Sequence, residues 1–232
     1  GLLRSIFKLL GLELSAPDHT TLSRRAGGLQ VELRRLLTTE AVHLIVDATG
    51  LGIVGQGQWA AAKWGERGRR GWRKLHIAVD ESGRVLAAEL TDRRVADAEM
   101  LPGLMDQVVG PIRRLTADGG SDTREVHAAA GARGASVVIP PRRDAVVTGE
   151  PVFEQRDTHV ERIAEIGRRR VEAGQHAQAR AENTFSRYKR LFGGRLRARG
   201  EMAQRNEALT ACNILNRMSE LGMPRSERIA TA

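Results

Sequence analysis

Two aspartates each end a short apolar run in this sequence. Asp47 follows Val42–Val46, and Asp118 follows a second run that begins at Arg114. Ligands gather at the carboxyl ends of strands in α/β sheets, and carboxylate oxygens are the ligands that hard divalent cations prefer. The pattern therefore favours an acidic metal site at one sheet edge. Each aspartate alone is equally typical of a turn or a helix cap.

A third acid lies in a helical pattern together with a lysine. Glu182 and Lys189 are seven residues apart, which is two helical turns, so they share one face. The neighbouring face is apolar and is expected to pack on the sheet: Ala181, Phe185, Tyr188 and Phe192. The carboxylate of Glu182 and the ammonium of Lys189, on their shared face, could reach a metal and a phosphate beside the helix. The alternative is a surface ion pair, which contributes about 0.2–0.5 kcal/mol.

Several other chemistries find no support in the residue types. Zinc is disfavoured because no Cys/His cluster has its spacing, and acyl transfer is disfavoured because no Ser or Cys nucleophile stands with a His. The single Cys212 cannot form an internal disulfide and is expected to be a small buried side chain, as in a cytoplasmic protein. No apolar run approaches the roughly 18 residues of a membrane span.

The charge balance points to a polyanion. The 232 residues include 37 Lys and Arg against 28 Asp and Glu, a net charge of +9. Basic side chains neutralise phosphates and release counterions, so nucleic acid is the expected partner. With only three Trp, one Tyr and four Phe, binding of single strands by serial stacking is disfavoured.

Two basic stretches are the candidate DNA contacts. Within residues 63–76, the candidates are Arg67, Arg69, Arg70, Arg73 and Lys74. Within residues 187–199, they are Arg187, Lys189, Arg195, Arg197 and Arg199. Trp64 and Trp72 interleave with the first stretch, and Trp72 is expected to open a strand and pack in the core. The other possibility for these Trp side chains is that they stack on an unpaired base or wedge a duplex step. The alternative for the second stretch is a solvated helix face.

The elements that position these residues follow from periodicity and turn signals. Helices are expected over residues 1–14 and from Thr20 or Thr21 onward, with the second carrying a stripe that includes Leu22, Leu29 and Leu33. Strands are expected at 42–47, 72–80, 84–91, 114–118 and 135–139, and further helices at 98–109, 123–132, 161–192 and 201–221. Residues 142–160 are expected to be irregular, and Asp80 and Asp92 to be turn residues of the hairpin. This order is that of a mixed sheet with flanking helices.

Four ordered blocks resemble the DDE transposases of bacterial insertion sequences. They are Val46–Gly50, Arg73–Asp80, Leu115–Gly119, and Arg180–Thr184 with Lys189 and Gly193. Pro17–Arg25 resembles the segment that precedes the catalytic domain in the group whose last acid lies in a Tyr-Arg-Glu-Lys signature. The resemblance covers the chain from about residue 15 to residue 224.

The resemblance implies an RNase H-like α/β fold with Asp47, Asp118 and Glu182 as the catalytic, metal-binding triad and Lys189 as a catalytic residue. It implies Mg²⁺ or Mn²⁺, as two ions, and double-stranded DNA as partner, both at terminal inverted repeats and at the target, with a homodimer on the DNA. It also implies nucleoid association in the cytoplasm. We expect a helical segment at 1–40, as a remnant of an N-terminal DNA-binding domain, a catalytic domain at 41–222 and a loose tail at 223–232. Because the chain begins at Gly1 and its first Met is Met100, we expect it to be N-terminally incomplete.

Two positions depart from the signature. Counting back from Glu182, the Tyr of the family falls on Gln175 and the Arg falls on Gln178. Three hypotheses follow: a transposase that cleaves and joins DNA strands, a catalytically impaired DNA-binding remnant of such an enzyme, and a metal-dependent nuclease of the same fold. The intact acids favour the first, and the two glutamines favour the second.

Overall fold

A mixed six-stranded sheet forms the centre of the molecule. The structure, a computed structural model, describes residues 2–35, 40–55, 71–167 and 178–222. The sheet order is β3-β2-β1-β4-β5, with a short β6 paired to the end of β1. The strands are β1 (Val42–Ile53), β2 (Trp72–Val79), β3 (Val85–Asp92), β4 (Ile112–Thr116), β5 (Ser136–Val138) and β6 (Arg195–Leu196). β2 and β3 run antiparallel, whereas β4, β5 and β6 run parallel to their neighbours, so the predicted mixed α/β, RNase H-like fold is confirmed.

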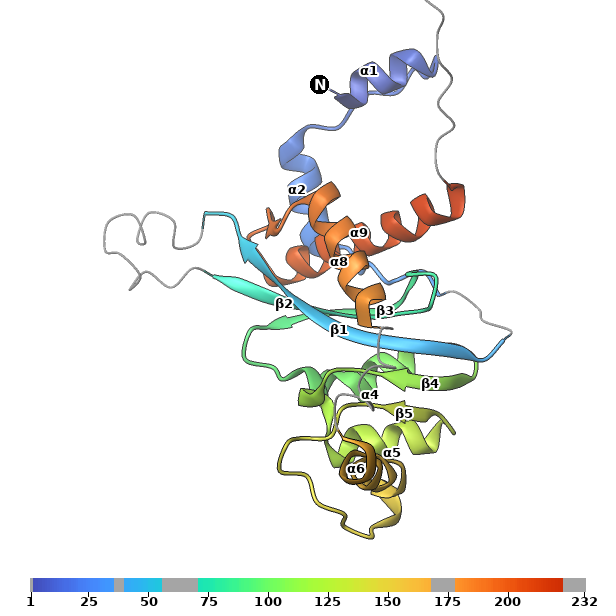
Figure 1. Cartoon of the computed structure of the whole chain (residues 1–232). Coiled ribbons are helices and arrows are strands. Elements are labelled where there is room, and N and C mark those ends of the chain that lie inside the picture. The colour runs from blue at the N-terminus through green and yellow to red at the C-terminus, as the bar shows by residue number, and fades with distance from the viewer. Residues whose placement is uncertain (1, 36–39, 56–70, 168–177, 223–232) are drawn as a thin grey trace, which may run out of the picture.

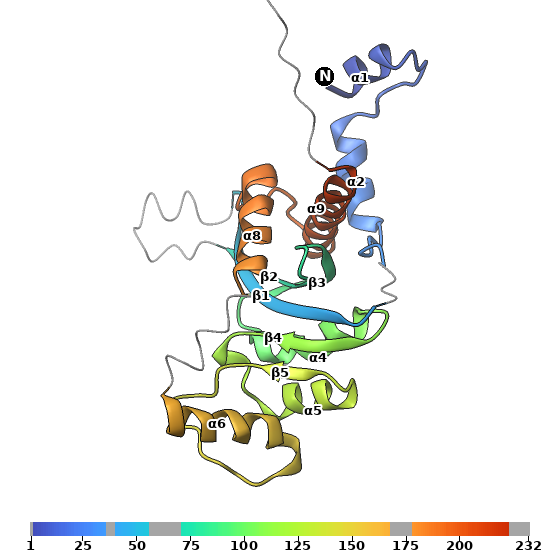
Figure 2. The same ribbon diagram turned by 45° about the vertical axis from the view of Figure 1, so that its right-hand side comes forward.

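Helices cover both faces of the sheet because β1 is apolar on both faces. Leu44 and Val46 enter a core with α4 (Asp97–Gln107) and α5 (Arg124–Ala132). Ile45 and Leu51 enter a second core with α8 (Ala179–Phe192) and α9 (Glu201–Leu221). Figures 1 and 2 show α8 and α9 on one side of β1 to β3, and α4 and α5 beside β4 and β5. The sheet therefore lies between two separately packed helical layers.

The first strand is longer than the sequence pattern predicted. β1 continues beyond Asp47 to Ile53, through Gly50 and Gly52. A Cβ at Gly50 would lie 3.4 Å from the Trp72 ring, and a Cβ at Gly52 would lie 3.4 Å from Arg195 Cγ. The glycines thus leave room for side chains that cross the strand, which a turn signal in the sequence does not distinguish. The two-residue β6 beside Gly52 was not predicted.

The N-terminal helices are shorter than predicted. α1 spans Leu2–Leu9, and α2 spans His19–Gly28. Asp18 caps α2 in place of the predicted threonines, since its carboxylate accepts hydrogen bonds from the His19 amide (2.8 Å) and the Thr20 hydroxyl (2.5 Å). Leu29 and Leu33, expected on the helical stripe, follow α2 in extended chain, and Leu33 packs against the α8–α9 core.

The helix α9 holds backbone from distant segments through asparagines. The Asn206 amide donates to the carbonyls of Ala26 and Leu29, and its oxygen accepts from the Val31 amide. The buried Asn216 donates to the Val85 carbonyl and accepts from the Val85 amide on the edge strand β3. The predicted bounds of this helix, 201–221, are confirmed.

The region before α8 differs from its prediction. A short turn, η3 (Pro151–Phe153), leads into α6 (Glu154–Ile166), where irregular chain was expected to continue to residue 160. Gly167, at φ 84°, ends α6. Gln175 falls outside the described residues, and Gln178 is the N-cap residue of α8. Among the described residues, no helix combines the length and apolar character needed to cross a bilayer.

Candidate active site

Of the two predicted strand-end aspartates, Asp47 lies within β1, and Asp118 lies two residues beyond the end of the neighbouring strand β4. β1 and β4 pair in parallel with Ile45 opposite Thr116, so two residues further along both chains Asp47 lies beside Asp118. Asp47 is opposite Ile77 of β2, and Ile77 belongs to the α8–α9 core. Cross-strand partners share a face, so the Asp47 side chain is on the face that α8 covers.

The third acid approaches from α8. Ala181, Phe185 and Tyr188 are buried in the α8–α9 core, as predicted, and leave Glu182 and Lys189 on the exposed face of the helix. Burial raises the pKa of the Asp47 carboxyl, a hydrogen bond from the Ala48 amide opposes that shift, and the charges of Asp118 and Glu182 raise it further. Asp118 and Glu182 are thus both close enough for their charges to act on Asp47.

Each strand aspartate has one oxygen held by the protein. The Ala48 amide donates to Asp47 Oδ1 at 2.8 Å, and the Ser121 hydroxyl donates to Asp118 Oδ1 at 3.0 Å. No ion pair within the described part of the chain uses Asp47, Asp118 or Glu182. A Cβ at Gly120 would lie 3.4 Å from both Asp118 oxygens, so Gly120 stands directly beside this carboxylate.

The carboxylate oxygens of Asp47, Asp118 and Glu182 are chemically suited to bind a divalent cation. Carboxylate oxygens are the ligands that such ions take, and the Asp47 carboxylate is already partly desolvated. Within the described ranges, no three His, Cys, Asp or Glu side chains already stand close enough to hold a metal ion. The exposed Asp118 and Glu182 side chains would therefore have to rotate toward Asp47.

Arginines after α8 extend the exposed basic surface. Lys189 is exposed on α8, and Arg195, Arg197 and Arg199 are exposed on the segment that follows it. None of these four side chains forms an ion pair with another described residue. Arg187 is half-buried and donates to the Ser219 hydroxyl, so it partly serves the packing of α8 on α9.

The earlier basic stretch is placed differently. Arg67, Arg69, Arg70 and Trp64 lie outside the described residues. Arg73 pairs with Glu201 (3.1 Å) and Asp92 (3.8 Å), and Lys74 pairs with Asp97 (3.2 Å). Both side chains are about one-fifth exposed, so their charges are largely paired within the chain.

Trp72 opens β2, as predicted, but it is 36% exposed and lies against Gly50. Its prediction as a core residue was wrong, because it lies on the end of β2 beyond the helical layers.

A fourth acid escaped the sequence analysis. Asp97 is the first residue of α4, and its charge also raises the pKa of Asp47. Its Oδ1 lies 3.1 Å from His76 Nδ1 and 3.2 Å from Lys74 Nζ. Neither contact has hydrogen-bond geometry, and this buried oxygen has no hydrogen-bond partner among the described residues. The packing of α4 against β2 brings Asp97 to Lys74 and His76, so no local sequence pattern reveals this group.

A buried ionic cluster supports the loop after Asp118. The Asp122 carboxylate accepts from His127 Nε2 (3.0 Å), Arg156 Nε (3.2 Å) and the Arg142 amide (3.2 Å). These hydrogen bonds and the Arg156 charge lower the pKa of Asp122 against the opposing effect of burial. The short turn that carries Asp118 is thereby fixed to α5 and α6.

The other acids of the hairpin are structural. Asp80 accepts from the amides of Ser82 and Arg84, and Asp92 accepts from the Arg94 amide, so both are turn residues as predicted. Cys212 is buried, which raises the pKa of its thiol to about 12 and fits its predicted packing role.

Two family models match the chain, and both are described as a transposase DDE domain. One matches residues 38–217, which is more than half of the chain, and the other matches residues 1–56. The longer match contains Asp47, Asp118 and Glu182.

Proposed function

Because this chain belongs to the DDE-domain transposase family, we propose that it cleaves and joins DNA strands at insertion-sequence ends, with Asp47, Asp118 and Glu182 as its catalytic acids. One observation supports the proposal: Asp47 on β1 lies beside Asp118, which follows the end of β4, and the charges of both Asp118 and Glu182 act on Asp47. The proposed substrates are the terminal inverted repeats and the target duplex. A homodimer that holds two DNA ends, and nucleoid association through DNA, belong to the same proposal.

The family generally uses divalent metals, and Mg²⁺ or Mn²⁺ would be held here by Asp47, Asp118 and Glu182. Two such ions, when bound, activate an attacking oxygen and stabilise the leaving oxygen of a phosphodiester. The chain's own part is to fix the acids. The Ala48 amide orients the Asp47 carboxylate, the Ser121 hydroxyl orients the Asp118 carboxylate, and the packed face of α8 holds Glu182 over β1.

Positive side chains complete the proposed reaction site. Lys189 lies two turns beyond Glu182 on the same exposed face of α8, where its ammonium would contact a phosphate next to the reacting bond. The unpaired Arg195, Arg197 and Arg199 would bind phosphates further along the same DNA.

A catalytically impaired DNA-binding protein is the second candidate. Gln178 stands one helical turn before Glu182, at the start of α8, where the related signature has an arginine. A glutamine brings no charge and no bidentate fork to a phosphate. In this candidate, the basic surface still binds DNA, but the reaction at the acids is slow.

The deciding experiment uses labelled duplexes that carry the inverted repeats flanking the gene, incubated with Mn²⁺ or Mg²⁺. We expect strand nicking followed by joining to a target duplex. Asp47→Asn, Asp118→Asn and Glu182→Gln should each abolish nicking while DNA binding persists. Nicking that survives all three substitutions would refute the proposed catalytic acids, and binding without nicking by the unaltered chain would favour the second candidate.

A further inference from the structure

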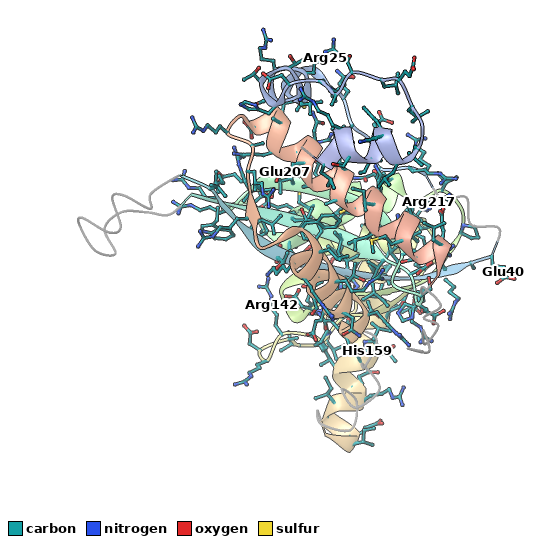
Figure 3. The ribbon with its side chains drawn as sticks, turned by 90° about the horizontal axis from the view of Figure 1, so that it is seen from above. Arg25, Glu40, Arg142, His159, Glu207 and Arg217 are labelled. Carbon is teal, nitrogen blue, oxygen red and sulfur yellow. The ribbon has the colours of Figure 1, made fainter. Side chains whose placement is uncertain are left out.

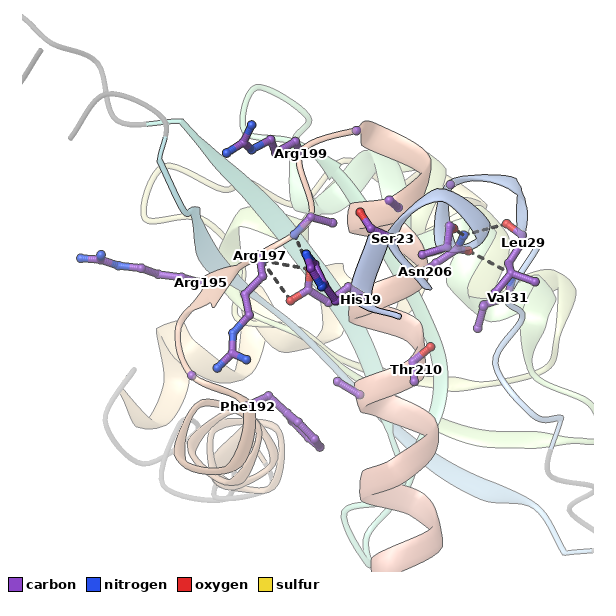
Figure 4. A pocket seen from close by; sticks show the side chains of 18 of the residues that line it. His19, Ser23, Leu29, Val31, Phe192, Arg195, Arg197, Arg199, Asn206 and Thr210 are labelled. Carbon is purple, nitrogen blue, oxygen red and sulfur yellow. Dashed lines mark hydrogen bonds between the residues drawn. The ribbon is translucent and has the colours of Figure 1, made fainter. Parts of the chain in front are cut away.

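An open groove of about 1220 Å³ lies at a distance from the catalytic acids, between α2, α9 and the segment 195–200. Asp47, Asp118 and Glu182 do not line it. In Figure 4, Arg195, Arg197 and Arg199 lie on one side of α9, whereas Leu29 and Val31 lie on the other. Two segments far apart in sequence therefore form its walls.

The first wall is an extended segment that presents arginines. Leu196 is 1% exposed, and the alternate residues Arg195, Arg197 and Arg199 are exposed. The Glu207 carboxylate accepts from the amides of Arg197 (2.9 Å) and Ala198 (2.8 Å). The Gln204 amide donates to the carbonyls of Ala198 and Arg199 at 3.1 Å. The backbone of this wall is thus fixed, while its arginine side chains are free to bind.

The second wall is α2, and the same part of α9 holds it. His19, Ser23 and Arg24 line the groove from α2. Asn206 donates at 2.7 Å to the carbonyls of Ala26 and Leu29, which fixes the C-terminal end of that helix. Gln204, Asn206 and Glu207 are neighbours on α9, so one helical turn sets the separation of both walls. A groove with fixed walls pays little ordering cost when it binds.

The charges on the walls determine the kind of occupant. Arg24 joins the three arginines of the first wall, and none of the four has a carboxylate partner within the described part of the chain. Glu207 is the acid among the described lining residues, and backbone amides occupy its oxygens. A second copy of this basic chain is disfavoured here by like charge, whereas a polyanion is favoured.

The floor of the groove narrows the choice further. Leu29, Phe192 and Ile214 contribute apolar surface, which suits the deoxyribose rings between phosphates. Serial base stacking needs several aromatic platforms, and among the described lining residues the rings are those of Phe192, the buried Tyr188 and the small imidazole of His19. The chemistry therefore fits the sugar-phosphate backbone of a duplex better than an unpaired strand.

We propose that this groove holds the backbone of duplex DNA whose reacting phosphate lies at the catalytic acids. This inference rests on the proposed function, which identifies the DNA as an insertion-sequence end. The helix α8 links the two sites, with Glu182 near its start and Phe192 at its end. These residues are about 15 Å apart along the helix axis. That distance corresponds to roughly four to five base pairs at 3.4 Å each.

The test places a negative charge in the groove. Thr210 is exposed and lines the groove between the walls, so Thr210→Glu should fold normally and weaken binding of a fluorescein-labelled duplex by roughly tenfold or more. The matched control is Thr158→Glu, at an exposed position of α6. Its neighbour His159 lies far from Arg25 of α2 and from Glu207 in Figure 3, so the control should change binding by less than about twofold.

A second variant removes charge instead of adding it. Arg24→Ala, on the exposed face of α2, should weaken binding and reduce the slope of log affinity against log salt by about 0.9, the value for one lost phosphate contact. Equal affinity of Thr210→Glu and Thr158→Glu for the duplex would overturn the proposal. So would a Thr210→Glu variant that binds DNA normally but changes its oligomeric state in sedimentation, because the groove would then bind a second copy of the chain. If the unaltered chain nicks DNA and the Thr210→Glu and Arg24→Ala variants bind DNA normally, only the proposal that the groove binds DNA is refuted. Groove-dependent binding without any nicking would refute only the catalytic proposal.

Discussion

At the scale of single residues, Asp47 carries a cost in stability. Its pKa is raised in the folded chain, because of burial first and the neighbouring acids second. An acid with a raised pKa binds its proton more tightly when folded, so its ionisation destabilises the fold once the pH exceeds the unfolded pKa. The penalty is absent at low pH, appears as the pH rises, and is complete above the folded pKa.

We therefore predict that Asp47→Asn abolishes strand nicking but raises the thermal midpoint at pH 7 by roughly 1–4 °C. At pH 3 the gain should vanish, because Asp47 is then protonated in both states. Calorimetry at the two pH values measures both effects. Asp144→Asn, at an exposed turn, is the control and should change neither. A lower midpoint for Asp47→Asn at pH 7 would contradict the proposed repulsion among the acids.

The signature residues before Glu182 allow a second residue-scale prediction. Gln175→Tyr combined with Gln178→Arg should raise nicking at least tenfold, an effect of about 1.4 kcal/mol on the barrier. The reason is that an arginine meets developing phosphate charge that glutamine leaves unmet. Nicking rates of both proteins on the same labelled ends with Mg²⁺ provide the measurement. Full activity of the unaltered chain, or no gain in the double variant, would show that the glutamines do not limit the reaction.

Sequence spacing predicted residues whose position depends on one element, and it missed those that depend on tertiary pairing. The exposed face shared by Glu182 and Lys189, for example, followed from the helical period alone. Arg73 could not be assigned in this way, because its partner Glu201 is 128 positions away and belongs to α9.

At the scale of elements, α9 stabilises a sheet edge through one side chain. Asn216 is 5% exposed and satisfies both the amide and the carbonyl of Val85 on β3. Asn216→Ala should cost roughly 2–4 kcal/mol, since it leaves two buried backbone groups without partners. Chemical denaturation measures the loss. Asn213→Ala on the same helix, which frees exposed contacts to Glu32 and Arg34, is the matched control and should cost less than about 1 kcal/mol. Equal costs would mean that helix propensity, not the Val85 contact, sets the effect.

The extended segment after α8 yields an electrostatic prediction. Changing Arg195, Arg197 and Arg199 together to Ala should flatten the salt dependence of DNA binding by up to about 2.7 in the log–log slope, because each phosphate contact contributes about 0.9. Titrations at several salt concentrations measure the slope. Arg93, Arg94 and Arg113 changed together to Ala form a control of equal charge on other segments. An unchanged slope in the first variant would identify its arginines as a merely solvated surface.

Element boundaries were predictable where local signals agreed with packing. The bounds of α9 matched because its apolar stripe continues unbroken between Gly200 and Gly222. β1 was predicted too short because its glycines resemble a turn in sequence, whereas in the fold they accommodate Trp72 and Arg195. The stripe assigned to α2 ended early because Leu29 and Leu33 follow the helix in extended chain, where Leu33 packs against the α8–α9 core.

At the scale of the whole molecule, the N-terminal region has two distinct parts. α1 has no buried residue, whereas Val31 and Leu33 pack against the α8–α9 core. Deleting residues 1–16 should therefore change the thermal midpoint by less than about 2 °C. Deleting residues 1–34 should lower it by roughly 5 °C or more, because it also orphans Asn206. Thermal melts of the two shortened chains provide the measurement. Equal midpoints would support the sequence-based division at residue 40.

The overall fold was predictable because its signals are redundant. The order of strands and helices, the apolar runs and the four motif blocks all agreed on a mixed sheet. The groove between α2 and α9 was not predictable, because its walls come from residues 19–31 and 195–199, and only α9 brings them together.

The polar anchors of α9 impose an order of events during synthesis. Its contacts to residues 26–34 join positions more than 170 apart in the chain, and the α8–α9 core takes five buried side chains from this last helix. A ribosome releases residue 26 long before residue 206, so β1 to β3 must wait with one apolar face uncovered until the final helix emerges. A transcript cut short before α9 would thus yield a chain prone to aggregation and degradation, not a shorter DNA-binding protein.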